Sequence, residues 1–406
     1  MAASSGPSPF CPPPNHQTDV MDSTPTASPP PLDGIRVIDF SRVLAGPLIG
    51  QVLGDLGADV IKVERPGHGD DTRTWGPPWS ADGTATYYLS LNRNKRSIVL
   101  DLKHPDDAAF ARRLALTGDI VLDNFKPGFM ASLGLDRASL AKENPAIITA
   151  TVSAFGSDTD AADLPGYDLA VQGMSGIMHL TGSADGPPLR AGVPIVDMLT
   201  GYNAAIGVLA SLAQARQTGT GRHVEVSLYD AAIAGLLNHQ TAVLMGDAEP
   251  RRSGNPHASI APYSSYACAD GNIVVAAAND KLFAGLCRAI DRTDLLDDPR
   301  FATNTSRRDH LDDITGILDA TFVTDTRAHW IGRIRAEDVP CGPINDVGEA
   351  IDWGLEMAMD PIVTGDDGYR AIRFPVRLDG DRSTTATRRP PHLGEHSEEI
   401  RAEVDG

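Results

Sequence analysis

Short apolar runs rich in β-branched residues alternate with more polar stretches between residues 35 and 155. One intervening stretch, 105–117, begins with Pro105 and places apolar residues at Phe110 and Leu114, which predicts a helix. Strands that alternate with helices indicate βαβ units and a parallel sheet. We therefore predict an α/β fold with a Rossmann-like domain whose strands cover 35–40, 60–64, 97–102, 120–125 and 147–152.

The pattern changes in the second half of the chain. A run of small and apolar residues over 196–217 predicts a long helix, which ends at the Gly-rich segment 218–221. We expect further strands over 222–228 and 273–277, and helices over 229–245, 281–291, 311–322, 326–335 and 397–403. We place the first part of the large domain at 32–200, a linker helix at 201–224, and a smaller α/β domain at 225–325.

Composition separates the beginning of the chain from the rest. Residues 1–31 are rich in Pro and Ser and contain no Lys or Arg, so we expect a disordered leader and no secretory signal. The four cysteines lie far apart without a CxxC pair, which predicts neither disulfides nor a zinc site and favours a reducing, cytoplasmic location. No apolar run approaches the roughly 18 residues that span a bilayer, so we expect no membrane partner.

Charge and loop chemistry exclude two further classes of ligand. Lys and Arg number 35 against 54 Asp and Glu, and the formal charge of −19 argues against a nucleic-acid-binding surface. The first predicted strand is followed by Ser41-Arg42-Val43-Leu44 and not by a GxGxxG sequence. This absence argues against a dinucleotide cofactor.

One carboxylate stands on a turn that leads into a helix-like segment of small residues. Pro165-Gly166-Tyr167 precedes Asp168, and residues 169–176 follow it. An Asp in this setting can act as a covalent nucleophile, because an acyl-aspartyl anhydride splits one difficult acyl transfer into two easier steps. The alternative is a turn residue or a helix N-cap. The residues around Asp168 alone leave both interpretations open.

Several motifs in a fixed order accompany Asp168. They are 32–40 (LDGIRVIDF), Ala45-Gly46-Pro47, 53–67 (LGDLGADVIKVERPG), 92–102 (NRNKRSIVLDL), 123–128 (DNFKPG) and Leu133-Gly134-Leu135. Together these motifs resemble the class III CoA-transferase family, which includes formyl-CoA transferase, carnitine CoA-transferase and the α-methylacyl-CoA racemases. The resemblance runs from about residue 32 to about residue 373. It implies that residues 326–406 return to the large domain and form the C-terminal tail, and that two subunits form a homodimer interlocked like linked rings.

The resemblance also implies a chemistry. Asp168 would attack an acyl-CoA and carry first an aspartyl anhydride and then an aspartyl-CoA thioester, with no metal and no permanently bound cofactor. Acyl-CoA and a small carboxylic acid are the implied substrates. An acidic protein that binds CoA phosphates has to gather its few cations locally. The implied CoA contacts are Val43, Arg65, Asn94, Lys95, Arg96, Asn124, Phe125 and Lys126. For the basic residues, the alternative is that they are solvated loop residues.

Departures from the family pattern reduce the number of reactions that the chain is expected to catalyse. Racemases of this family carry Gly-His-Asp where Gly166-Tyr167-Asp168 stands, and their second catalytic acid corresponds to Asp197. A Tyr removes the base that titrates near neutrality, so we prefer the transferase and regard Asp197 as structural or supporting. Leu44 and Ser153 replace a Gln and a Lys of formyl-CoA transferase, which argues against oxalate-specific chemistry.

The segments 171–182, 190–194 and 341–345 look closest to family members that use succinyl-CoA with small dicarboxylates. A dicarboxylate leaves one carboxylate unreacted, and an Arg is the best partner for it. Arg73, Arg190 and Arg252 are the candidates, and the sequence does not choose among them. A racemase is the alternative activity. A non-catalytic CoA-binding protein and a nicotinamide-dependent oxidoreductase are more remote alternatives.

Overall fold

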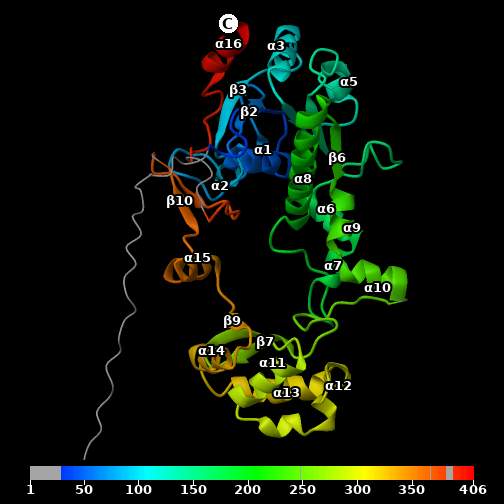
Figure 1. The fold of residues 1–406 in the computed structure, drawn as a ribbon, viewed down its shortest axis with the longest axis vertical. Coiled ribbons are helices and arrows are strands. Elements are labelled where there is room, and N and C mark those ends of the chain that lie inside the picture. The colour runs from blue at the N-terminus through cyan, green and yellow to red at the C-terminus, as the bar shows by residue number, and fades with distance from the viewer. Residues whose placement is uncertain (1–28, 247, 366, 381–386) are drawn as a thin grey trace, which may run out of the picture.

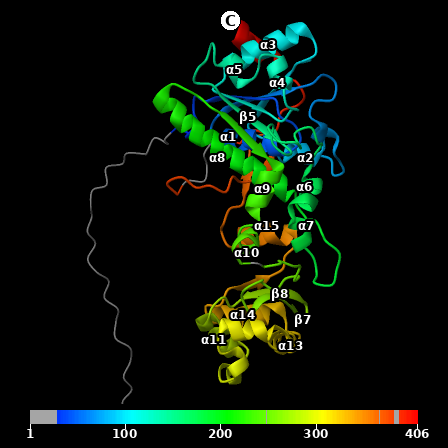
Figure 2. The ribbon, with the colours of Figure 1, turned by 90° about the vertical axis from the view of Figure 1, so that its right-hand side faces the viewer.

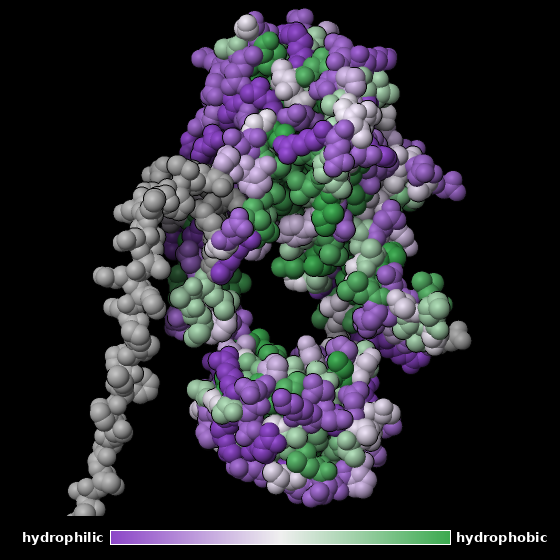
Figure 3. Space-filling model, in the orientation of Figure 1, coloured by the Kyte–Doolittle hydropathy of each residue, from purple (hydrophilic) through white to green (hydrophobic). Residues whose placement is uncertain are grey.

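The computed structural model describes residues 29–246, 248–365, 367–380 and 387–406. Most of the leader expected over 1–31 therefore lies outside the described residues. The described chain forms a large domain at one end of an elongated molecule and a smaller domain at the other (Figure 1). The chain passes to the small domain along one side and returns along the other, and Figure 3 shows an opening between these two connections.

A six-stranded parallel sheet forms the centre of the large domain. Its strands are β1 (Arg36–Asp39), β2 (Asp59–Glu64), β3 (Lys95–Val99), β4 (Ile120–Asp123), β5 (Ile148–Ser153) and β6 (His223–Ser227). Their order is β3-β2-β1-β4-β5-β6, and every neighbouring pair is parallel. The predicted α/β class with a parallel sheet is confirmed. Strands β2 and β3 extend the sheet to one side of β1, and β4, β5 and β6 extend it to the other side. Such a switch point in strand order places a crevice at the carboxyl ends of the strands.

The helices number sixteen in the described residues. They are α1 (Ala45–Asp55), α2 (Thr86–Leu89), α3 (Pro105–Leu116), α4 (Phe129–Ser132), α5 (Arg137–Leu140), α6 (Asp168–Ser175), α7 (Ile177–Leu180), α8 (Ile195–Thr218), α9 (Leu228–Gly235), α10 (Asn238–Gly246), α11 (Asp280–Ala289), α12 (Asn304–Asp309), α13 (Leu311–Phe322), α14 (Arg327–Ala336), α15 (Val347–Glu356) and α16 (Ser397–Asp405). Short 3₁₀ turns cover Asp71–Thr74, Thr293–Leu296 and Pro299–Phe301. The single helix expected over 229–245 is broken at Leu237, whose φ of 46° ends α9 before α10 begins.

Each face of the parallel sheet has its own apolar core. Val37 of β1 belongs to the core under α1 and α8, and the next residue, Ile38, belongs to the core under α3 and α16. Successive side chains of a strand point to opposite faces, so apolar runs without polar interruption are what a sheet covered on both faces requires. The uninterrupted apolar centres of β1 and β4 are therefore explained by burial on both sides.

Helix α8 corrects the expected linker at 201–224. Figures 1 and 2 show it beside α1 and the sheet, and its residues Ala204, Val208 and Leu212 belong to the same buried core as α1. The strand that follows, β6, is the sixth strand of the large sheet and not part of a small domain. By length and composition α8 is the one helix among the described residues that could cross a membrane. Part of its apolar surface, including Val208 and Leu212, lies in the core of the large domain, and another part, including Ile206, is exposed.

The small domain begins later in the chain than expected. Strands β7 (Tyr263–Cys268), β8 (Gly271–Ala276) and β9 (Cys341–Pro343) form an antiparallel sheet in the order β7-β8-β9, and α11, α13 and α14 pack on it around a separate apolar core. Because β9 belongs to this sheet, the small domain extends past residue 325. The sequence expectation missed it because β9 is a three-residue strand containing Gly342 and Pro343.

The C-terminal segment lies back on the large domain. A hairpin of β10 (Ile362–Thr364) and β11 (Arg370–Ile372) follows α15, and α16 then packs beside β3. The backbone N–H of His396 donates to the carbonyl of Ser97 at 3.0 Å, and Ile400 of α16 is fully buried. The far end of the chain thus completes the edge of the sheet next to β3.

Candidate active site

Asp168 is the first residue of α6, and its carboxylate sits on the first turn of a different helix. Oδ1 accepts hydrogen bonds from the backbone N–H groups of Val196 at 2.8 Å and Asp197 at 3.2 Å. These N–H groups begin α8, whose N-cap residue is Pro194 and makes no side-chain cap. The first N–H groups of a helix lack internal partners and carry partial positive charge. The long helix α8 therefore fixes the Asp168 carboxylate by completing its own N-terminus.

Gln172 holds the other oxygen of the same carboxylate. Its Nε2 donates to Oδ2 of Asp168 at 2.5 Å, and its Oε1 accepts from the backbone N–H of Ala191 at 2.8 Å. The Gln172 side chain is fully buried, so both ends of its amide are committed to these two partners. The residues around Arg190 are thereby tied to Asp168 through one amide group.

Asp197 adds a second carboxyl group next to the first. Burial and the nearby Asp168 carboxylate raise the pKa of Asp197 to about 7. Burial and the charges of Asp197 and Asp168 also raise the pKa of Tyr87 to about 12. Two carboxyl groups this close do not ionise together easily, so one holds a proton near neutrality.

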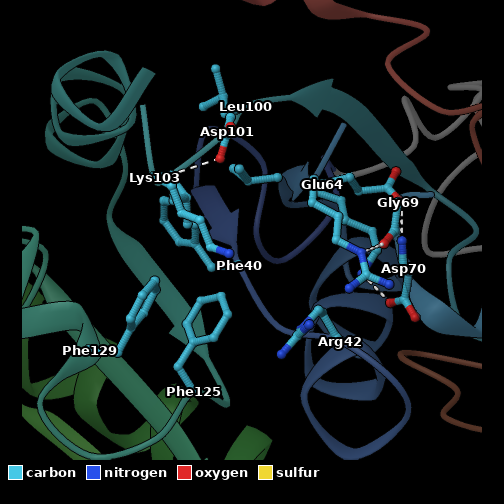
Figure 4. A pocket seen from close by; sticks show the side chains of 14 residues that line it. Phe40, Arg42, Glu64, Gly69, Asp70, Leu100, Asp101, Lys103, Phe125 and Phe129 are labelled. Carbon is cyan, nitrogen blue, oxygen red and sulfur yellow. Dashed lines mark hydrogen bonds and ion pairs between the residues drawn. The ribbon is translucent and has the colours of Figure 1, made fainter. Parts of the chain in front are cut away.

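Two neighbouring cavities open at the carboxyl ends of the strands. One has a volume of about 280 Å³ and reaches Asp197 and Tyr167, the residue before Asp168. The other, of about 320 Å³, is lined by Phe40, Lys62 and Leu100 and is drawn in Figure 4. Arg42 and Phe125 line both cavities and stand between them. A ligand that reaches through both passes from the sheet edge to Tyr167 and Asp197, the neighbours of Asp168, at the place where parallel α/β sheets bind ligands.

Five of the eight predicted CoA contacts line these cavities. They are Val43, Arg65, Asn124, Phe125 and Lys126. Asn124 uses its whole amide on the backbone of Arg42, donating to its carbonyl at 2.7 Å and accepting from its N–H at 3.0 Å. Asn124 thus shapes the loop after β1. The Arg65 guanidinium contacts the Asp71 carboxylate and donates to the Gly69 carbonyl, and it remains nearly half exposed.

The other three predicted contacts, Asn94, Lys95 and Arg96, line neither cavity. Lys95 is buried, and its ammonium donates to Asp39, to the carbonyl of Pro47 and to Asn92 at 2.8–3.0 Å. Burial lowers the pKa of Lys95 to about 8, while the Asp39 carboxylate acts in the opposite direction.

Neighbouring residues of the predicted basic cluster serve the fold in the same way. Arg96 forms ion pairs with Asp59 of β2 and with Glu399 and Glu403 of α16. Asn94 hydrogen-bonds to Asp55 and to the backbone of Arg388. The interpretation of 94–96 as a phosphate site is corrected here, because the donors of these three side chains are engaged by acidic and backbone partners of the large domain.

Sequence reasoning missed Arg42, Lys103 and Gln172. Arg42 follows β1, lies 5.3 Å from the Phe125 ring centroid, and has a buried Nε without a partner among the described residues. Lys103 follows β3 and lines the cavity of Figure 4. Both stand just after the carboxyl end of a parallel strand, and that position was a signal available in the sequence. Gln172 carried no comparable signal because its role depends on the distant Ala191.

The loop that carries Val43 is held in an unusual conformation. Val43 has a φ of 73°, which a β-branched residue rarely adopts. Its N–H donates to the Asp70 carboxylate, and the fully buried Lys62 pairs with Asp70 at 2.9 Å and donates to the Ser41 carbonyl. Burial opposes ionisation of Asp70, but the Lys62 ammonium prevails and lowers its pKa to about 2. A buried ion pair thus fixes the wall between the two cavities.

Of the three arginines considered for a second carboxylate, one is already occupied. Arg73 makes two hydrogen bonds to Glu64 at 2.9 and 2.7 Å and one to the Tyr88 hydroxyl at 2.6 Å. Arg190 is exposed, and within the part of the chain that the structure describes its Nη1 donates only to the neighbouring carbonyls of Ala191 and Gly192. Arg252 donates to the His179 carbonyl at 2.8 Å. Arg190 is the candidate whose loop is tied to Asp168.

Known proteins resemble this chain over more than nine-tenths of its length. A succinate–glutarate CoA-transferase from Agrobacterium fabrum is 41% identical over 393 residues, covering 93% of this chain and 96% of that protein. The human succinyl-CoA:glutarate CoA-transferase is 37% identical, covering 92% of this chain and 86% of that protein. A crystal structure of a CAIB/BAIF family protein from Brucella suis superposes with a TM-score of 0.84 at 38% identity, covering 93% of this chain and all of that one. The model of CoA-transferase family III matches residues 32–397, and the chain belongs to that family.

Proposed function

We propose that this protein transfers CoA from succinyl-CoA to a small dicarboxylic acid through covalent intermediates on Asp168. The single observation that carries the proposal is the Asp168 carboxylate, fixed by three donors beside a cavity that continues toward Arg65 and Lys103. The similar enzymes named above, which act on succinate, succinyl-CoA and glutarate, support the choice of substrates.

The proposed reaction consumes the Asp168 carboxylate in its first step and regenerates it in its last. An Asp168 oxygen adds to the thioester carbon of succinyl-CoA, the C–S bond breaks, and a succinyl-aspartyl anhydride forms with CoA as the leaving group. CoA then attacks the aspartyl carbon, and succinate leaves with one oxygen that belonged to Asp168. The acceptor carboxylate attacks the aspartyl-CoA thioester to form a second anhydride. CoA finally attacks the acceptor carbonyl and restores the Asp168 carboxylate.

The hydrogen bonds divide the roles of the two carboxylate oxygens. Oδ1 is bound by two backbone N–H groups of α8, so Oδ2 is the oxygen we assign to the attack. When CoA later adds to the aspartyl carbon, negative charge develops on Oδ1. Two preorganised N–H groups at a helix N-terminus stabilise such a charge without rearrangement.

Cations along the two cavities support CoA as the carrier. Arg42, Arg65, Lys103 and Lys126 line the cavities of a chain whose formal charge is −19. Charge-assisted hydrogen bonds from such side chains are the usual means of holding phosphates. We assign Arg65 and Lys103 to the phosphate end because both line the cavity that is farther from Asp197.

The acceptor's second carboxylate is assigned to Arg190. Its guanidinium is exposed, and the Gln172 bridge from Ala191 to Asp168 fixes the residue next to Arg190 relative to the nucleophile. Arg fits a carboxylate in two parallel hydrogen bonds, which gives geometric selectivity as well as attraction. A monocarboxylic acid lacks the group that this contact recognises.

The proposal is tested by incubating wild type and Asp168→Ala with succinyl-CoA and a panel of free acids labelled with ¹⁸O in their carboxylates. Mass spectrometry follows every acyl-CoA and the released succinate. We expect a new dicarboxyl-CoA, and ¹⁸O in succinate after the first turnover, because each acceptor leaves one oxygen on Asp168 for the next succinate. Asp168→Ala should lose both signals.

A matched control is Asp185→Asn, an exposed acidic residue in the loop before α8. It should keep the activity and the label transfer. Transfer of CoA without ¹⁸O in succinate would disprove the covalent aspartyl route. Failure of wild type to form any new acyl-CoA, with CoA binding demonstrated, would disprove the transferase.

We also propose that the protein acts as a homodimer. Exposed apolar side chains occur on two helices of the described chain, at Tyr202 and Ile206 of α8 and at Val243, Leu244 and Met245 of α10. Figure 3 shows apolar side chains around the opening between the two domains. Apolar patches of this kind usually mark an interface. Light scattering coupled to size-exclusion chromatography should give twice the chain mass of 43.0 kDa.

A further inference from the structure

Asp197 is a carboxyl group that the transfer reaction described above leaves without a task. It lies on the first turn of α8 and lines the cavity of about 280 Å³ that also contains Tyr167. Its backbone N–H holds Asp168, but its own carboxyl oxygens have no hydrogen-bond partner among the described residues. A structural carboxylate in a protein interior is normally paired, because burial of an unpaired charge is costly.

We infer that the Asp197 carboxyl group is a general acid and base for the sulfur of CoA, an inference that rests on the proposed transferase function. When Oδ2 of Asp168 displaces CoA from the acyl group, the Asp197 proton moves to the departing sulfur. The products of this step are the anhydride, CoA thiol and the Asp197 carboxylate. When the sulfur attacks the aspartyl carbonyl, its proton returns to Asp197. Each later pair of steps repeats the exchange, and no other reactant is consumed.

The charges of the cavity favour this alternation. Burial and the charge of Asp168 raise the pKa of Asp197 to about 7, so the group carries a proton near neutral pH while Asp168 is an anion. Acylation neutralises Asp168 and removes that repulsion. Asp197 then becomes a stronger acid at the moment when a thiolate, with an ordinary pKa near 8.5 for a thiol, needs a proton. Asp197 therefore carries the negative charge while Asp168 is an anhydride, and the released carboxylic acid carries it while Asp168 is a thioester.

The other ionisable groups around Asp197 do not replace it. Tyr87 of α2 faces the same pair of carboxyl groups, and its pKa of about 12 keeps it protonated through the physiological range. The charged side chains that line the same cavity are Arg42, Asp71, Lys126 and Asp163. Among these groups, Asp197 is the one whose surroundings raise its pKa to about 7 and whose backbone N–H donates to Asp168.

The test compares wild type, Asp197→Asn and Asp197→Glu, with Asp185→Asn as control. We expect Asp197→Asn to lower kcat by about 10²- to 10³-fold, the usual contribution of a positioned acid. Asp197→Glu should recover part of that loss. The KM for succinyl-CoA should change by less than about threefold, because CoA phosphates bind in the other cavity. Circular dichroism and CoA binding establish that each variant is folded.

The pH profile separates an acid from a structural residue. Wild-type kcat should fall as pH rises through about 7, where Asp197 loses its proton, and this limb should be absent in Asp197→Asn. A solvent deuterium effect on kcat should be present in wild type and lost in the variant. Asp197→Asn with wild-type kcat, or with reduced kcat and an unchanged alkaline limb, would overturn the inference while leaving the transferase intact. Absence of transfer in wild type would instead overturn the proposed function, and this inference with it.

Discussion

Replacing Asp197 by Asn should make the stability of the protein less dependent on pH. Burial and the Asp168 charge move the pKa of Asp197 from the ordinary 3.8 to about 7 in the folded chain. A raised pKa means that the folded state keeps a proton that the unfolded state has already released. Its stabilising contribution is complete below about pH 4 and is lost as pH rises through about 7. Asn carries no charge and removes this dependence.

The size of the effect follows from the same shift. At about 1.4 kcal/mol for each tenfold change, a pKa raised from 3.8 to about 7 corresponds to about 4 kcal/mol over the whole window. Between pH 5 and pH 8, wild type should lose about 3 kcal/mol of this amount. The stability of Asp197→Asn relative to wild type should therefore increase by about 3 kcal/mol over that interval.

Urea denaturation of both proteins at pH 5 and pH 8 measures this double difference, in which titrating groups that do not interact with Asp197 cancel. Asp168→Asn is an informative partner variant, because removing the neighbouring charge should lower the pKa of Asp197 and shrink the effect. A relative stability that stays constant within about 0.5 kcal/mol between the two pH values would refute the assignment of a proton to Asp197. The whole electrostatic argument for its general-acid role would then lose its basis.

Four further variants test other parts of the structure. Lys95→Met should lower the free energy of unfolding by about 3–5 kcal/mol, because it leaves the buried Asp39 without its ion-pair partner. Lys103→Met should mainly raise the KM for succinyl-CoA, by about tenfold or more. Urea titrations and initial rates distinguish the two effects. Gln172→Leu should lower kcat by about 10- to 100-fold and destabilise the fold by about 1–3 kcal/mol, since buried polar groups of Asp168 and Ala191 lose their partner; steady-state kinetics and melting curves check both. Val43→Gly should raise the free energy of unfolding by about 1 kcal/mol, because glycine adopts a φ of 73° without strain; an unchanged or lower urea midpoint would contradict this.

The basic segment at 93–96 shows the limit of inference from sequence. Four polar or cationic residues next to a strand resemble a phosphate site, and the sequence contains nothing that reveals their partners. Arg93 pairs with Asp55 and Arg96 with Asp59, residues about 40 positions earlier in the chain. The partners meet these side chains only because β2 and β3 lie side by side. Residue type gave the correct charge and the wrong role.

Features that depend on neighbours along the chain could be predicted from residue order alone. Apolar runs buried on two faces predicted the parallel sheet, and the turn before Asp168, with its surrounding motifs, identified the candidate nucleophile and the family. Only the tertiary structure decided which groups surround that nucleophile. The N-terminus of α8 lies 28 residues after Asp168 and meets it through the packing of α6 against α8. The raised pKa of Asp197 and the two cavities have the same origin, because burial and charge proximity are properties of packed elements and are not encoded in local periodicity.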